Sequence, residues 1–137
     1  MAASQVVRVL LRTPLEFNNV AASSTLVVPL VGRIPVAQYK NVIMNVKLLS
    51  VTIGSGATVA FKAIPDASTD FVIVTDPNNP LATVTLTSTS AANAPYSAQL
   101  DATKIPAMIG IWVYATQPGS QQTIKVEIEI ELIMREQ

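Results

Sequence analysis

Apolar and polar residues alternate strictly along the last part of the chain. Between residues 124 and 134 every even-numbered position is apolar, while the odd-numbered positions include Glu127, Glu129 and Glu131. Successive side chains of a strand point to opposite faces of a sheet, so this period of two predicts a strand with one buried and one solvated face. Residues 5–12 alternate in the same way and predict a second strand of this kind.

Short runs rich in Val, Ile and Thr recur through the rest of the chain, separated by Pro, Gly, Asn and Asp, as is typical of strands joined by turns. The predicted strands lie at about residues 5–12, 25–31, 41–53, 57–64, 70–75, 81–88, 96–100, 108–116 and 122–134. Gly54-Ser55-Gly56 lies between two of them and predicts a tight hairpin. Residues 35–40, which begin with proline, predict a single helical turn.

A chain of strands without crossover helices excludes a doubly wound parallel sheet, because parallel strands need long connections. The economical arrangement is one domain over residues 1–137 in which two antiparallel sheets pack face to face. We therefore predict an all-β, jelly-roll-like sandwich of eight to nine strands. The first strand is expected to pair beside the last, which places Arg8 and Arg12 near the three glutamates.

The composition removes most catalytic and metal-binding chemistry. The 137 residues include no cysteine and no histidine, so thiol nucleophiles, thiolate and imidazole metal ligands and the commonest general base are missing. Nine basic and nine acidic residues cancel, whereas non-specific binding to nucleic acid needs a basic excess. We therefore predict a protein that is not an enzyme, holds no cofactor or metal and binds no nucleic acid.

The N-terminal residues do not combine a basic segment with an apolar one, so we expect no signal peptide. The apolar runs are also too short to span a membrane. We therefore expect a protein that is made in a cytoplasm and has no membrane partner.

The glutamates at positions 127, 129 and 131 form the first candidate site. Neighbouring carboxylates on one strand face lie about 6.7 Å apart and repel, so something is expected to neutralise them. A bound cation and a glycosidase-like pair of acid and base carboxylates are two alternatives. The alternative that we favour is cross-strand pairing with Arg8 and Arg12, or with Lys residues, on a solvated face.

Two further groups are candidates for protein contacts. Trp112 and Tyr114 share one face of their strand, where exposed aromatic side chains would anchor a protein interface or stack on a sugar. Alternatively, both face the core or are covered by a loop. Alternation is lost around Leu49, Val51 and Ile53, which predicts a strand buried on both sides, a bulge or a subunit contact.

The order of elements over residues 24–134 provides a different kind of clue. It consists of an apolar run at 39–53, the Gly54-Ser55-Gly56 turn, a strand at 57–65 that ends in Pro-Asp, residues 71–76, an apolar strand after Lys-Ile-Pro within 100–115, and the alternating strand at 122–134. This order resembles small β-sandwich proteins of tailed-phage virions, of the head-decoration or auxiliary capsid type. The resemblance implies a capsid-surface protein, often oligomeric, that reinforces the shell.

We therefore expect a structural virion protein on the capsid surface. Its expected partners are the major capsid protein and copies of itself, as trimers first and homodimers second. A charged content of only 13% suits such packing, because each buried charge costs several kcal/mol. The alternative is a glycan- or receptor-binding β-sandwich module of a tail or fibre.

Overall fold

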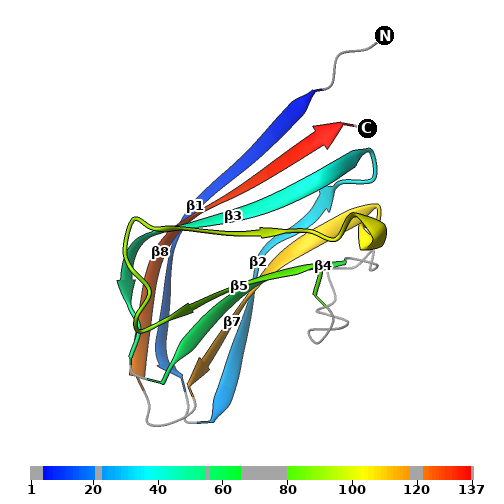
Figure 1. Ribbon diagram of the computed structural model, residues 1–137. Helices are drawn as coiled ribbons and strands as arrows, with labels where there is room; N and C mark the ends of the chain where they lie inside the picture. Colours follow the sequence, from blue (N-terminus) through cyan, green and yellow to red (C-terminus); the bar gives the residue numbers. More distant parts are fainter. Residues whose placement is uncertain (1–4, 21–22, 55, 66–79, 118–121, 137) are drawn as a thin grey trace.

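The structure is a computed structural model that describes residues 5–20, 23–54, 56–65, 80–117 and 122–136. Within these ranges the chain forms two antiparallel four-stranded sheets (Figure 1). Sheet A contains, in spatial order, β1 (Val6–Val20), β8 (Gln122–Glu136), β3 (Tyr39–Thr52) and β6 (Pro95–Gln99). Sheet B contains β2 (Ser24–Pro35), β7 (Met108–Gln117), β4 (Thr58–Pro65) and β5 (Ala82–Thr87).

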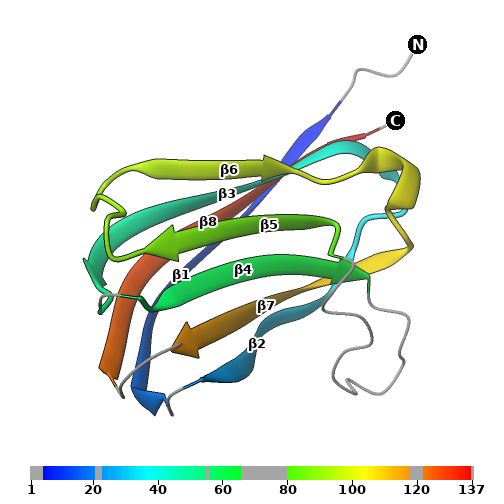
Figure 2. The same ribbon diagram turned by 60° about the horizontal axis from the view of Figure 1, so that its bottom comes forward.

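The strand order is that of a jelly roll. Apart from β4 and β5, strands that follow each other along the chain lie in different sheets, and the two sheets pack face to face (Figure 2). The all-β, jelly-roll-like sandwich predicted from the sequence is therefore confirmed. The strand predicted at residues 70–75 lies outside the described residues.

Two local predictions are wrong. The segment between β3 and β4 is not a hairpin, because it carries the chain from sheet A to sheet B. It does contain a turn, in which the Gly54 carbonyl accepts a hydrogen bond from the Ala57 N–H at 3.0 Å. The helical turn expected at residues 35–40 is a single reverse turn between β2 and β3, closed by a 2.9 Å hydrogen bond from the Tyr39 N–H to the Val36 carbonyl.

A short 3-10 helix, Ala102–Lys104, was not predicted. Asp101 caps it, since one carboxylate oxygen accepts hydrogen bonds from the Thr103 N–H at 3.0 Å and from the Thr103 hydroxyl at 2.6 Å. These two bonds hold the pKa of Asp101 below its ordinary value, with a smaller contribution from the nearby charge of Lys104. The helix leads the chain from β6 in sheet A to β7 in sheet B.

The core lies between the two inner faces. All six even-numbered residues of β8 from Ile124 to Met134 are buried, as the alternation predicts. They meet inward residues of β3, β4 and β7, and each fully buried aliphatic or aromatic side chain stabilises the fold by about 1.5–3 kcal/mol. The largest buried side chains of the whole core are Phe61, Met44, Leu48, Leu86, Leu100, Ile109, Ile111, Ile124, Ile128, Ile130 and Leu132.

The lost alternation in β3 is a bulge. Pairing with β8 shifts register between Leu48 and Ser50, so an extra residue, Leu49, stands opposite β8. After the shift, Val51 packs against the core and Ile53 is buried in it. The bulge therefore returns the apolar residues of this segment to the inner face.

Replacing Leu132 by alanine should lower the free energy of unfolding by about 2–5 kcal/mol, because the cavity lies in the closely packed centre of the core. Thr85→Ala, at an exposed position of β5, is the control and should change it by less than about 0.5 kcal/mol. Urea unfolding followed by circular dichroism measures both values. Equal midpoints for the two variants would contradict the assignment of the inner face.

Candidate functional site

The candidate site is the outer face of sheet A, where β1 pairs with β8. The pairing confirms the prediction that the first strand lies beside the last and places Arg12 directly opposite Glu129. Arg12 Nε lies 3.9 Å from Glu129 Oε1, and its Nη2 lies 3.7 Å from Glu127 Oε1. Arg8 lies opposite Ile133 and forms no ion pair among the described residues. One arginine, rather than two, therefore balances Glu127 and Glu129. These two residues and Glu131 are called the acidic ladder below.

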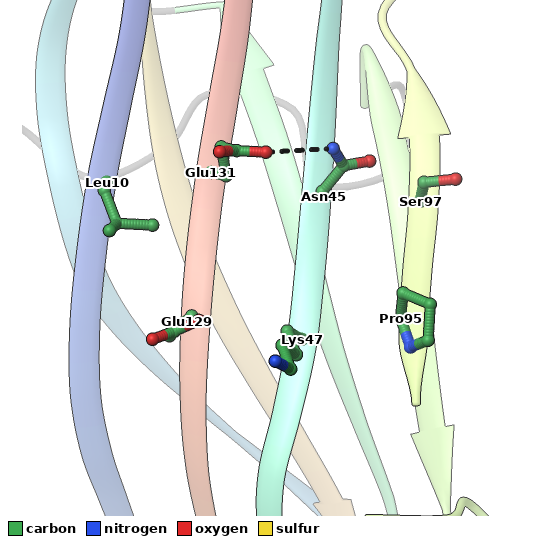
Figure 3. A pocket seen from close by; sticks show the side chains of 7 residues that line it. All are labelled: Leu10, Asn45, Lys47, Pro95, Ser97, Glu129 and Glu131. Carbon is green, nitrogen blue, oxygen red and sulfur yellow. Dashed lines mark hydrogen bonds between the residues drawn. The ribbon is translucent and has the colours of Figure 1, made fainter. Parts of the chain in front are cut away.

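Glu131 has different neighbours. It lies between Leu10 of β1 and Asn45 of β3 in the sheet register. Asn45 Nδ2 donates a hydrogen bond to Glu131 Oε1 at 3.4 Å (Figure 3). The three carboxylates thus have charged or polar partners from the strands on both sides of β8. Of the expected cross-strand pairing, the part through Arg12 is observed, whereas Arg8 does not take part and Asn45 was not predicted. No group of three or more Asp, Glu, His or Cys side chains that could hold a metal ion occurs in the described part of the chain.

A hollow of about 410 Å³ lies on this face (Figure 3). All four strands of sheet A contribute to its lining, which consists of Leu10, Asn45, Lys47, Pro95, Ser97, Glu129 and Glu131. Lys47 lies directly across from Glu129, so the hollow contains both signs of charge. It offers hydrogen-bond donors and acceptors to a polar ligand but has no aromatic side chain in its lining.

A second hollow of about 320 Å³ lies further along β8 on the same face. It is lined by Pro14, Leu15, Glu16, Ser50, Lys125, Val126 and Glu127. Lys125 Nζ lies 3.8 Å from Glu16 Oε1, which gives this end of the face another pair of opposite charges. Ion pairs of this exposed kind fix side-chain positions more than they add stability.

Trp112 and Tyr114 are buried, each with 8% of its surface exposed, so the structure shows the alternative in which they are covered. They lie on the outer face of sheet B and form a small apolar cluster with Ile64 and Ala60. Lys62 Nζ lies 4.4 Å from the centre of the Tyr114 ring, close enough for a cation–π contact. Burial raises the pKa of the Tyr114 phenol above its ordinary value.

The apolar positions predicted on β3 are distributed differently. Ile53 is a core residue, Val51 packs against the core, and Leu49 is half-buried at the bulge. Most of the apolar surface of this segment is therefore used inside the sandwich.

The apolar side chains that the structure exposes differ from those predicted from the sequence. Five large apolar side chains among the described residues are 36–60% exposed, and they are Val6, Leu10, Leu26, Val27 and Met108. The first two lie on β1 and the next two on β2, while Met108 pairs with the end of β2. β1 and β2 are edge strands on the same side of the sandwich (Figure 2), but their exposed side chains face different ways: Leu10 lies on the outer face of sheet A, whereas Val27 and Met108 lie on the outer face of sheet B. The one local signal was Leu10, which stands among the polar positions of the first strand.

Comparison with protein-family models and with curated proteins finds no match to this chain. The structure has no helix, over the residues it describes, that is long and apolar enough to cross a membrane. The function is therefore inferred from the outer faces of the two sheets and from the edge strands of the sandwich.

Removal of the Arg12 charge should destabilise the fold through the loss of both ion pairs. Arg12→Gln should lower the free energy of unfolding by about 0.2–1 kcal/mol per pair in low salt, and by less in high salt. Lys40→Gln is the matched control, because Lys40 lies opposite Arg135 rather than opposite an acid. Urea unfolding at two ionic strengths measures the difference. If both variants lose the same stability at each salt concentration, Arg12 does not balance the ladder.

Tyr114 should make stability depend on pH in alkaline solution. The folded chain holds the phenol proton more tightly than the unfolded chain does, so the free energy of unfolding should fall as the pH rises above about 10. Tyr114→Phe removes this proton and should reduce the fall. Urea unfolding at about pH 9 and about pH 11 tests this. The same alkaline loss in the variant as in the original chain would show that Tyr114 is not responsible.

Proposed function

We propose that this chain is a structural virion protein that binds the head shell of a tailed phage and reinforces it. The proposal is supported first by the jelly roll, an architecture that viral capsid proteins share with lectins and other proteins. This support is an analogy at the level of the fold, and a fold alone does not determine a function. The exposed side chains provide more specific support.

The observation that carries the proposal is that the exposed large apolar residues of the described chain lie on or beside the two edge strands β1 and β2. Large apolar side chains are exposed on β1, on β2 and beside β2. Exposed apolar side chains gathered along edge strands favour contact with another protein. A protein that reinforces a shell needs such a surface toward its neighbours.

The outer face of sheet A is largely charged, and Leu10 lies on it beside Arg8, Arg12 and Glu131. Its charges are arranged in pairs, such as Arg12 with Glu127 and Lys125 with Glu16, and the face presents no large excess of one sign. Such a surface is stable in water and binds other molecules weakly. In the proposed role it is the face that remains in contact with solvent on the outside of the particle.

Binding to heads that were assembled without this protein tests the proposal. We expect saturable binding at micromolar concentration and greater resistance of the decorated heads to heat. Leu26→Asp places a charge at an exposed apolar position of the edge strand β2 and should weaken binding, while Thr85→Asp places the same charge on β5, at the other edge of sheet B, and should not. Cosedimentation with heads measures all three proteins. The absence of binding by the unmodified chain would contradict the proposal.

The second candidate function is recognition of a glycan or receptor by a module of a tail or fibre. It is favoured by the hollow on sheet A, whose lining includes Asn45, Ser97 and the two glutamates at positions 129 and 131 (Figure 3). The absence of an aromatic side chain among the seven lining residues makes this hollow a weak platform for sugar rings. Sugar binding that is abolished by Asn45→Ala would favour this function over the first.

A further inference from the structure

The edge formed by β1 differs from the other three edges of the sandwich. β6 has only five residues and begins with a proline, β5 has only six residues, and β2 contains Pro29 and two interruptions in its pairing with β7. Short strands, prolines and bulges are the features that protect edges from pairing with other chains. In contrast, β1 pairs with β8 without interruption from Val6 to Phe17. Among the described strands it has no neighbour on its other side.

The direction of the backbone groups of β1 follows from one hydrogen bond. The Gln5 carbonyl accepts the Glu136 N–H at 2.9 Å, and residues 5 and 136 are directly opposite in the register. Because antiparallel strands alternate bonded and non-bonded pairs, the odd-numbered residues of β1 bond to β8. The even-numbered residues point their N–H and C=O groups to the open side. Pro14 fits this assignment, since its missing N–H costs no bond to β8.

We propose that two copies of this chain pair through residues 5–13 of β1, antiparallel and about a two-fold axis at Val9. The pairing joins the two four-stranded sheets A into one continuous sheet. It uses the open N–H and C=O groups of residues 6, 8, 10 and 12 in each copy, which gives about eight hydrogen bonds across the dimer. The partner is a second copy because the side chains of β1 complement themselves in this register.

Other registers place unfavourable groups opposite each other. An axis at residue 8 or 12 sets an arginine against its own copy, and an axis at residue 10 sets Arg8 against the partner's Arg12. Like charges in directly opposite positions destabilise a sheet. An axis at residue 11 sets Pro14 against the partner's Arg8, whose carbonyl then has no donor. The axis at Val9 avoids both defects and keeps Pro14 outside the paired region.

This register also covers apolar surface on both faces. On the inner side Val9 meets the partner's Val9, and Val7 meets the partner's Leu11, all at positions that are only half-buried in the single chain. On the outer side Leu10, which is 60% exposed, lies opposite the partner's Arg8. The aliphatic part of an arginine side chain can cover a leucine while its charged end stays in water.

The partner's Arg8 also has an acid within reach. Leu10 separates it from Glu131, which lies opposite Leu10 on β8. Two strand spacings amount to roughly 10 Å, a gap that an extended arginine and a glutamate span together. Glu131 accepts a hydrogen bond from Asn45 and forms no ion pair among the described residues. An Arg8–Glu131 pair between the copies completes the neutralisation of the ladder.

Cysteine cross-linking tests the register, and the chain has no cysteine of its own. Val9→Cys should form a covalent dimer on mild oxidation, because directly opposite residues have Cα atoms about 4.5–5.5 Å apart, within the range of a disulfide. Leu11→Cys alone should not, since the two copies of residue 11 are about 13 Å apart. A mixture of Val7→Cys and Leu11→Cys should cross-link again. Gels run without reductant show the products.

Charge reversal tests the contact between the copies. Arg8→Glu should weaken the dimer about tenfold or more, and Arg8→Glu combined with Glu131→Arg should restore much of the loss. Analytical ultracentrifugation measures the dissociation constants, and circular dichroism checks that each variant is folded. Lys40→Glu is the control, since it reverses a charge on the same face of sheet A but on β3, which β8 separates from β1.

The outcomes separate this inference from the proposed function. A folded chain that remains a monomer at high micromolar concentration, or equal cross-linking of Val9→Cys and Leu11→Cys, would overturn the β1 pairing. A trimer in the ultracentrifuge would do the same, since a two-fold edge pairing closes at two copies. Binding of either a monomer or a dimer to heads is measured independently, so the failure of one proposal leaves the result for the other intact.

Discussion

The fold depends on the pairing of the first strand of the chain with the last. β8 lies between β1 and β3 in sheet A, and its inward side chains from Ile124 to Met134 are all buried. Its outward side chains include glutamates that form ion pairs with Arg12 and accept a hydrogen bond from Asn45. This one strand therefore supplies both a central part of the core and the solvated face. Because its partners lie far away in the sequence, the sheet forms only when both ends of the chain come together, which is typical of slow-folding β-sandwiches.

Regular alternation made the architecture predictable, and its absence limited the details. The period of two in β8 and β1 identified their faces, and the lack of helices identified the sandwich. Turn residues were less informative, because the glycines around Ser55 indicate a reversal of direction but not which sheet the next strand joins. Residues 35–40 have a proline that suits the start of a helix and also a reverse turn, so tertiary pairing decided between them.

The charged part of the site could be predicted, whereas the apolar part could not. Glu129 and Arg12 follow from strand alternation and from one correct pairing. Trp112 and Tyr114 lie on a strand that is apolar on both faces, so periodicity alone could not show that they are covered. Leu10 was visible as an exception among polar positions, but its importance depends on β1 being an edge. The order of strands in a sheet is a non-local property that no short stretch of sequence contains.

Alternation in the sequence produces the two sheets of the sandwich, and β1 is the edge strand with the longest uninterrupted pairing on one side and no described strand on the other. The central claim is that the open side of β1 is paired in solution with a second copy. Amide hydrogen exchange measured residue by residue tests it most directly, because the N–H groups of Val9 and Leu11 bond to β8 while those of Leu10 and Arg12 point to the open edge. The account predicts that exchange at Leu10 and Arg12 slows as the protein concentration rises, while Val9 and Leu11 are protected throughout. Rapid exchange at Leu10 and Arg12 at every concentration would contradict it.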